Sequence, residues 1–297
     1  MAAEPMTCVA CGAAIAPHAE RLGKRADRHE DLAYPCACGW GFSNATAAGN
    51  RVAIAPSPSL NVPTEVRPGL DDVLARALNA RNRPAKRWKF CSAASEDAVT
   101  WSVFRALEQA GRLKVVAPGE GEPSLLLWGV PVSGNDAERA AAELEGLLAE
   151  LGERQSGRSE PDVVLVQPDV VVIVEAKYRS GNPPQPGYRG FERYLDRPVL
   201  FAASREQVAA AGFYELTRNW RIGVGLAERL DGCEFELVNL GMPAIEKSAA
   251  TFASLLAQTP ARRFRHETWA GLLASAGDLQ PWLVRYAAGR GLLQPAA

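Results

Sequence analysis

Two carboxylates and one lysine flank a long apolar run near the middle of the sequence. The run, PDVVLVQPDVVVIVEAKY over residues 161–178, carries Asp162 near its start and Glu175 and Lys177 near its end. Charged side chains are costly to bury unless they are paired or bind a metal ion. Two explanations are therefore open: ordinary charges at the surface of the strand ends, or a group of charges held together for chemistry.

The same run predicts a β-hairpin. Pro168 and Asp169 form a turn signal between two β-branched stretches. Because proline holds φ near about −65°, the commonest two-residue turn is disfavoured, and a four-residue loop over 167–170 is expected. Asp169 lies at the tip of this loop, roughly 20 Å along the strand from Glu175, and turn formation explains its presence.

The hairpin register decides whether the charges meet. With the turn at this position, Asp162 lies opposite Glu175, and Lys177 points to the same face as Glu175 because it is two residues further along the strand. Side chains that oppose each other across an antiparallel pair have Cβ atoms about 5 Å apart. Two carboxylates at this separation can share one divalent cation. The sequence therefore predicts a cation site at the open end of the hairpin.

A helix is predicted to begin at Glu96. Ser95 before it is a suitable N-cap residue. On a helical wheel Glu96 falls on the same side as Val103 and Leu107, which should face the sheet. Glu96 is therefore expected to point toward the sheet.

The remaining pattern predicts an α/β domain with a mixed sheet flanked by helices. Besides the hairpin, strands are expected over 124–132, 197–204 and 233–242, and helices over 69–82, 136–151, 212–230, 246–257, 264–275 and 281–289. Three regions follow: a cysteine-rich module over 1–50, a linker and helix over 51–87, with the linker itself at 55–69, and the α/β domain with its C-terminal helices over 88–297.

These residues together resemble the PD-(D/E)xK nuclease superfamily, which has the restriction-endonuclease-like fold. The resemblance rests on Asp162 preceded by Pro161, on Glu175-Ala176-Lys177 at the end of an apolar strand, and on the helix SEDAVTWSVFRAL, which is similar to the family's first core helix. It extends roughly from residue 88 to residue 245. The helix over 136–151 is an insertion relative to the family pattern, and nothing in the sequence assigns it a role.

The resemblance implies a nuclease that depends on Mg²⁺ or Mn²⁺. Asp162 and Glu175 would hold the ion, with the Ala176 carbonyl as a third ligand. Glu96, with Asp97 as the alternative, would complete the shell or serve a second ion. Lys177 would orient the attacking water and stabilise negative charge on the phosphoryl oxygens. The implied substrate is DNA rather than RNA, and because many such nucleases act as dimers, a homodimer is one implied assembly.

Four cysteines near the N-terminus predict a second metal site. Cys8 and Cys11 lie in CVACG, and Cys36 and Cys38 lie in CACGWG. Four thiolates suit tetrahedral Zn²⁺ in a closed, structural site, and a module of about 50 residues needs such a metal to fold. His18 and His29 are alternative ligands. We expect a zinc ribbon that engages DNA or a protein partner.

Three short stretches mix basic and aromatic residues and are candidates for nucleic-acid binding. RNRPAKRWK (81–89) contains Lys86, Arg87, Trp88 and Lys89, RNWR (218–221) contains Arg218 and Arg221, and RRFRH covers 262–266. Such residues can neutralise phosphates and stack on bases. The alternative is a solvated face, or arginines that cover apolar surface.

Bulk composition sets few further limits. The chain has 33 Lys and Arg against 34 Asp and Glu, so any surface for nucleic acid must be local. No apolar run reaches the roughly 18 residues of a membrane helix, and the start MAAEPMTC lacks the segments of a signal peptide. The sequence thus predicts a soluble cytoplasmic protein without membrane partners, and its Ala-, Arg- and Gly-rich composition is typical of a bacterium.

A second hypothesis belongs to a different functional class. The nuclease fold could serve as a scaffold that binds nucleic acid or protein, with the zinc module docking a partner and the charged site unused. Cleavage assays with Mg²⁺, Mn²⁺ or EDTA would separate the two hypotheses.

Overall fold

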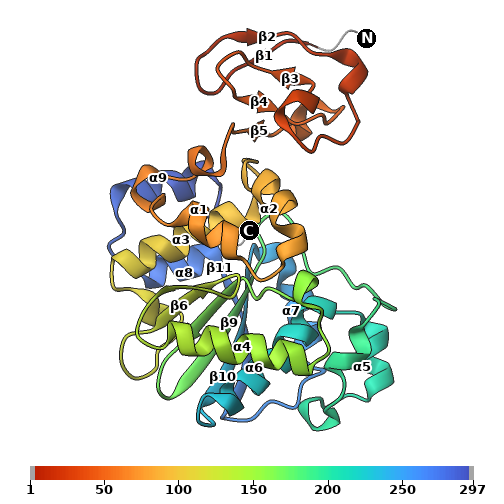
Figure 1. The fold of residues 1–297 in the computed structure, drawn as a ribbon, viewed down its shortest axis with the longest axis vertical. Coiled ribbons are helices and arrows are strands. Elements are labelled where there is room, and N and C mark those ends of the chain that lie inside the picture. Colours follow the sequence, from red (N-terminus) through yellow and green to blue (C-terminus); the bar gives the residue numbers. More distant parts are fainter. Residues whose placement is uncertain (1–3, 294–297) are drawn as a thin grey trace.

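A six-stranded mixed β-sheet forms the centre of the larger part of the chain (Figure 1). The computed structural model describes residues 4–293. The strands are β6 (Ser124–Leu127), β7 (Val130–Ser133), β8 (Val163–Val166), β9 (Val170–Ala176), β10 (Glu234–Gly241) and β11 (Arg262–Thr268), in the order β11-β10-β9-β8-β6-β7. β9, β10 and β11 run parallel, and the other neighbours are antiparallel. This arrangement confirms the predicted mixed sheet flanked by helices.

Helices cover both faces of the sheet. One side holds α1 (Leu70–Arg76), α3 (Glu96–Gln109), α8 (Trp269–Ser275) and α9 (Pro281–Gly289), and the other holds α4 (Ala137–Glu150), α6 (Tyr214–Arg229) and α7 (Glu246–Ala253). In β9 the residues alternate, so that Val172 and Val174 join the first core whereas Val171 and Ile173 join the second. The next odd-numbered residue, Glu175, therefore points to the α6 face.

The hairpin of β8 and β9 has the predicted register. Val163 pairs with Val174, so the next pair outward is Asp162 with Glu175. The backbone amide of Ala176 donates to Asp162 Oδ2 at 2.9 Å, which ties the acid to the neighbouring strand. The hairpin turn itself is closed by one hydrogen bond, from the amide of Gln167 to the carbonyl of Val170 at 2.9 Å.

Close packing fixes α6 over the sheet. A Cβ atom on Gly223 would lie 2.0 Å from Cε2 of Phe235 in β10, so only glycine allows this approach. Before α6, the short helix α5 (Arg205–Ala211) begins with a capping box of Ser204 and Gln207 and ends at Gly212, whose φ is +70°. The chain can then turn directly into α6, whose first turns lie near the ends of β8 and β9.

Three predictions of secondary structure are wrong. Residues 124–132 form a hairpin of two strands, β6 and β7, because Trp128 and Gly129 take φ values of 51° and 75°. Residues 197–204 form a 3₁₀ turn, Pro198–Leu200, rather than a strand, since proline has no N–H for a ladder. The pattern at 264–275 begins as the half-buried strand β11, and only Trp269–Ser275 is helical.

The N-terminal module contains five short strands. They are β1 (Met6–Thr7), β2 (Ala14–Ile15), β3 (Tyr34–Pro35), β4 (Gly41–Phe42) and β5 (Ala53–Ile54), in a two-stranded sheet β1-β2 and a three-stranded sheet β3-β4-β5. A small core of Cys8, Ile15, Ala33, Tyr34 and Phe42 lies within the module. Because β5 pairs with β4, this structural unit extends past residue 50, the predicted end of the module.

Backbone pairing attaches this module to the larger domain. The amide of Ala55 donates to the carbonyl of Cys91 at 2.8 Å, and the amide of Ala93 donates to Ala53 at 2.8 Å. The segment that follows, predicted as a linker, is packed as well: Val62 and Val66 are buried in the core. No helix in residues 4–293 is long and apolar enough to cross a membrane.

Candidate functional site

A polar cavity of about 290 Å³ lies where β8 begins and β9 ends, between the first turns of α3 and α6. All four residues predicted to form the cation site line it: Glu96, Asp162, Glu175 and Lys177. They come from three separate elements, and the register of the hairpin and the cap of α3 bring them together. We call this space the strand-end cavity.

Glu175 and Lys177 form a close ion pair at the bottom of the strand-end cavity. Lys177 Nζ lies 2.6 Å from Glu175 Oε1, and the two residues are 2% and 5% exposed. Burial favours the neutral amine, but the charges of Glu175 and Asp162 outweigh burial and raise the pKa of Lys177. The lysine is therefore a fixed positive charge at this site.

Ionisation of the Asp162 carboxyl group is disfavoured in this cavity. Burial and the negative charge of Glu175 raise the pKa of Asp162 well above its usual value, although Lys177 acts in the opposite direction. A carboxyl group of this kind is ionised more easily when a cation neutralises the negative charge beside it. A cation beside Asp162 and Glu175 would therefore lower the pKa of Asp162.

Glu96 reaches the site from the first turn of α3, as predicted. Its Oε2 accepts from the amide of Tyr178 at 2.7 Å and from the hydroxyl of Ser180 at 2.6 Å. Its Oε1 lies 3.7 Å from Lys177 Nζ. Burial raises the pKa of Glu96, against the opposing charge of Lys177.

Asp97, the alternative to Glu96, is engaged elsewhere. It pairs with Lys86 at 3.2 Å, and Lys86 also pairs with Glu160 at 3.1 Å. Lys86 is 7% exposed and lies 4.4 Å from the ring centre of Trp128. This lysine is an internal cation between two acids, so in this conformation it does not face a nucleic-acid ligand.

Two residues of the site were missed by the sequence analysis, and both lie on α6. Glu215 Oε2 is 2.9 Å from Lys177 Nζ, and burial, which would raise the pKa of Glu215, is outweighed by Lys177, so that this pKa is lowered. Asn219 Nδ2 donates to Glu175 Oε2 at 2.6 Å. Their spacing of four residues on one face of a helix is the signal that could have revealed them.

The other predicted basic residues have different positions. Arg218 lines the strand-end cavity and lies 3.5 Å from Glu175 Oε2. Arg221 points away and makes a bidentate pair with Asp196, at 2.7 and 3.0 Å. Arg87 pairs with Asp71 at 2.7 Å. In the 262–266 stretch, the edge strand β11, Arg263 and Arg265 pair with acids of their own or of the neighbouring strand.

The carboxylates of the strand-end cavity are held by protein groups. Both oxygens of Glu175 have partners, Lys177 on one side and Asn219 and Arg218 on the other. Within residues 4–293 the acids do not form a cluster in which three ligand atoms lie within 4.8 Å of one another. A divalent ion shared by Asp162 and Glu175 therefore requires the ammonium group of Lys177 to move aside.

The four N-terminal cysteines do form such a cluster. Their ligand atoms all lie within 4.8 Å of one another, and the Sγ–Sγ distance is 3.5 Å from Cys8 to Cys38, 3.5 Å from Cys11 to Cys36 and 3.4 Å from Cys36 to Cys38. Sulfurs at the corners of a tetrahedron with metal–sulfur bonds of about 2.3 Å would lie roughly 3.8 Å apart. The cluster could therefore hold one metal ion.

The local backbone supports a thiolate at Cys8. Burial opposes ionisation, yet backbone amides of Ala10 and Cys11 lower the pKa of Cys8 to about 6; the amide of Ala10 lies 3.4 Å from Cys8 Sγ. His18 and His29, the alternative ligands, are not members of the cluster. The four thiols form the site without them.

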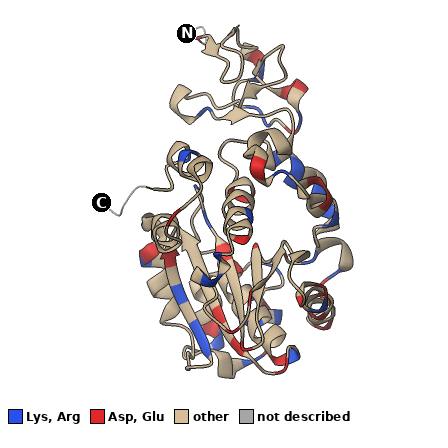
Figure 2. Ribbon diagram, turned by 90° about the vertical axis from the view of Figure 1, so that its left-hand side faces the viewer, with Lys and Arg blue, Asp and Glu red and all other residues tan. Residues whose placement is uncertain are grey.

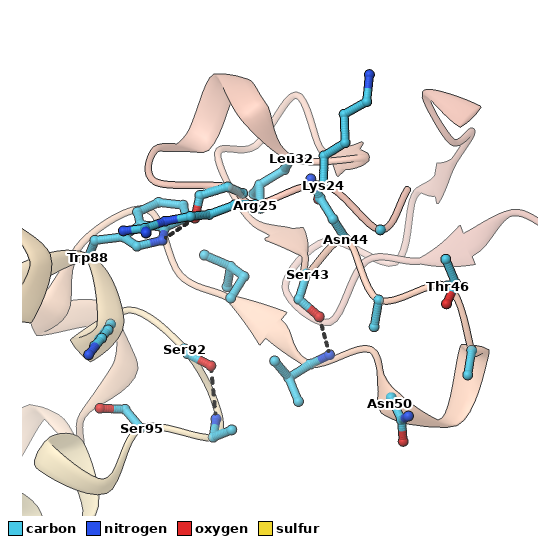
Figure 3. Close-up of a pocket in the computed structure, with 18 of the residues that line it drawn as sticks. Lys24, Arg25, Leu32, Ser43, Asn44, Thr46, Asn50, Trp88, Ser92 and Ser95 are labelled. Atoms are coloured by element: carbon cyan, nitrogen blue, oxygen red, sulfur yellow. Dashed lines mark hydrogen bonds between the residues drawn. The ribbon is translucent and has the colours of Figure 1, made fainter. Parts of the chain in front are cut away.

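A larger cavity of about 870 Å³ separates the N-terminal module from α2 (Arg83–Phe90) and α3. Lys24, Arg25 and Asn44 of the module and Trp88 of α2 line it, and in Figure 3 the Arg25 side chain extends toward Trp88 whereas Lys24 points away. Trp88 Nε1 donates to the carbonyl of Ala26 at 2.8 Å and so joins the two parts of the chain (Figure 3). Lys89 is exposed at this cavity, which also reaches Glu96.

Charge is not segregated over the molecule as a whole. Figure 2 shows basic and acidic residues interspersed along the helices and strands, in agreement with the nearly balanced totals of 33 and 34. Comparison of the chain with protein-family models, with curated proteins and with solved structures found no match. Functional inference therefore rests on the geometry of the site.

Proposed function

We propose that the protein is a Mg²⁺-dependent nuclease that hydrolyses phosphodiester bonds in DNA. The single observation that carries the proposal is the convergence of Asp162, Glu175 and Lys177 on one sheet face, with Glu96 above them, in an open polar cavity. In chain order, helix α3, strands β6, β8 and β9, helix α6 and strand β10, with β7, α4 and α5 as additional elements, support the restriction-endonuclease-like fold that the sequence resembles.

The residues have complementary roles in this reaction. Asp162 and Glu175 provide oxygens for the ion, and a bound Mg²⁺ would polarise the scissile phosphate and lower the pKa of a water molecule. Once released from Glu175, the Lys177 ammonium can hold the attacking water and stabilise negative charge on the phosphoryl oxygens. Glu215, 2.9 Å from Lys177 Nζ, can retain the lysine in the cavity after this shift.

Zn²⁺ is the proposed ion of the cysteine cluster. Four thiols with no open position are typical of a structural site rather than a catalytic one. Zinc would hold the module in shape and thereby maintain one wall of the cavity in Figure 3, through which the module could contact DNA or a protein partner.

Cleavage assays test the nuclease proposal. Purified protein would be incubated with plasmid and linear DNA in Mg²⁺, Mn²⁺ or EDTA, and compared with Lys177→Ala and with Lys247→Ala as a matched surface control. The proposal predicts cleavage by the wild type and by Lys247→Ala only in the presence of the metal ion. Absence of wild-type cleavage, or equal cleavage by Lys177→Ala, would overturn it.

One observation favours the alternative function, a binding scaffold. Because Lys177 and Arg218 already offset the charge of Glu175 and Asn219 donates a hydrogen bond to it, Glu175 is satisfied without a divalent ion. A scaffold would bind DNA equally well with Mg²⁺ and with EDTA and would leave it intact. The same assay, with binding measured beside cleavage, decides between the two.

A further inference from the structure

A second cavity, of about 480 Å³, adjoins the strand-end cavity. The two share four lining residues, among them Tyr188 and Tyr214. Four arginines line the second cavity: Arg81, Arg154, Arg189 and Arg193. We call this cavity the arginine–tyrosine groove.

Three of these arginines are available to a ligand. Arg81, Arg154 and Arg189 are exposed, and among residues 4–293 they form neither a salt bridge nor a side-chain hydrogen bond, whereas most other arginines of the chain do. Unpaired guanidinium groups gathered around one cavity bind phosphates well, because each can make charge-assisted hydrogen bonds.

The lining of the groove has one acid, Glu153, against four arginines. Glu153 Oε1 accepts from the Tyr194 hydroxyl at 2.5 Å, and its Oε2 accepts from the amide of Ser159 at 2.5 Å. Both oxygens are thus used to hold the wall of the groove. The excess of positive charge on the lining is local, which is what a chain with nearly balanced charge needs in order to bind a polyanion.

An exposed aromatic ring lies beside the arginines. Tyr188 is 46% exposed, and its ring lies against Tyr214, with centroids 3.9 Å apart. Tyr214 is supported in turn by Phe191 and Tyr194, whose ring centroids lie 5.7 and 5.8 Å from it. The outer side of Tyr188 is therefore a supported platform, and it lies at the junction of the two cavities.

We propose that the arginine–tyrosine groove binds an unpaired stretch of the nucleic-acid substrate, with phosphates on Arg81, Arg154 and Arg189 and a base stacked on Tyr188. A base face is open to stacking in a single strand but is covered in a duplex, so an exposed aromatic platform beside free arginines fits unpaired nucleotides. This inference rests on the proposed nuclease function, and it makes the substrate DNA with a single-stranded segment beside the bond that is cut.

Binding without cleavage tests the inference. Fluorescence anisotropy in EDTA would compare a labelled single-stranded oligonucleotide with a blunt duplex of the same sequence, over a range of salt concentrations. Tyr188→Ala should weaken single-strand binding about tenfold with an unchanged salt dependence. Tyr188→Phe is the matched variant and should bind like the wild type, because stacking needs the ring and not the hydroxyl.

The three exposed arginines of the groove are tested by the salt dependence of binding. Replacing Arg81, Arg154 and Arg189 together by Ala should lower the magnitude of the slope of log affinity against log salt by about 2, at roughly 0.7 per lost phosphate contact. Lysines at the same positions should restore most of the slope, and Arg112→Ala with Arg285→Ala serves as the control for exposed arginines outside the groove.

Each outcome decides the inference separately from the nuclease proposal. Equal or stronger binding of the blunt duplex by the wild type, or no loss of single-strand binding in the Tyr188 and arginine variants, overturns the groove even if DNA is cleaved. Preferential single-strand binding that these variants weaken supports the groove even if the protein cuts nothing.

Discussion

The cysteine cluster and the strand-end cavity both gather groups that can bind metal ions, but they satisfy those groups differently. At the cluster, four sulfurs approach one another at 3.4–3.5 Å along three of their edges, and no Lys or Arg side chain pairs with them among the described residues. In the strand-end cavity, each Glu175 oxygen already has a cationic or amide partner. A metal ion completes the first site, whereas it must displace a protein cation at the second.

We therefore expect a structural ion at the cysteine cluster and an exchangeable ion in the strand-end cavity. The module has a small core, centred on five buried residues, so we expect its folding to depend on the free energy of metal binding. The larger domain has two extensive cores on the two sides of its sheet, and we expect it to fold without an ion. Tight binding is therefore expected at the cysteines, and weak, reversible binding is expected at the carboxylates.

The largest expected effect follows from removal of a thiol. Cys11→Ser should abolish metal binding at the cluster and unfold the module, because structural zinc contributes on the order of 10 kcal/mol to such folds. Metal content by mass spectrometry and the trypsin sensitivity of residues 4–54 would measure this. Cys233→Ser, a thiol remote from the cluster, is the control and should retain the metal. Full metal content in Cys11→Ser would contradict the structural role.

Substitution of Lys177 tests how the strand-end cavity differs from the cysteine cluster. Lys177→Met should lower the rate of DNA cleavage about 10²- to 10³-fold, by loss of the charge beside the reacting phosphate. It should also tighten Mn²⁺ binding about tenfold, because the ion no longer competes with the hydrogen bond from Lys177 to Glu175. Calorimetric titration beside the cleavage assay measures both changes. Weaker Mn²⁺ binding in this variant would show that Lys177 does not occupy the place of the ion.

Lys86 provides the comparison for a buried lysine outside the site. Lys86→Met should destabilise the protein by about 3 kcal/mol, since it leaves Asp97 and Glu160 without their shared cation. The salt dependence of DNA binding should not change, because this lysine is held inside the protein. Denaturant unfolding and anisotropy are the measurements. A lower salt slope at unchanged stability would instead restore the sequence-based prediction that Lys86 binds nucleic acid.

The smallest effect is expected at Asn219. Asn219→Ala removes the hydrogen bond to Glu175 Oε2 and should cost roughly 1.5 kcal/mol of unfolding free energy. Because Mg²⁺ can take over the released oxygen, addition of the ion should recover part of this loss. Thermal unfolding with and without Mg²⁺ measures it. The same loss at saturating Mg²⁺ would indicate that the ion does not reach Glu175.

Local rules explain what the sequence could predict. The Pro168-Asp169 turn sets the hairpin register, and this register alone places Asp162 opposite Glu175. The Ser95 cap sets the start of α3, and its hydroxyl accepts from the amide of Ala98 at 3.2 Å. Cysteine spacing sets the cluster. Each of these features depends on residues that are close in the sequence or on a periodic pattern.

Tertiary packing explains what could not be predicted. Glu215 and Asn219 join the site because Gly223 lets α6 approach Phe235 closely, which no local pattern indicates. The sequence around Lys86 predicts an exposed basic residue. In the structure Lys86 instead pairs with Glu160, which is 74 residues away. Arginines occupy both alternating sides of the edge strand β11, so its sequence lacks the alternation of polar and apolar residues that predicts a strand. In each case a distant contact overrides the local preference.

The proposed site requires that Asp162 and Glu175 share a divalent ion that displaces Lys177. Crystals grown with Mn²⁺ would locate this ion by its anomalous diffraction. We expect a peak about 2.1 Å from an oxygen of each carboxylate, with the ammonium group of Lys177 turned toward Glu215. Anomalous density confined to the cysteine cluster, with Lys177 still bonded to Glu175, would contradict it.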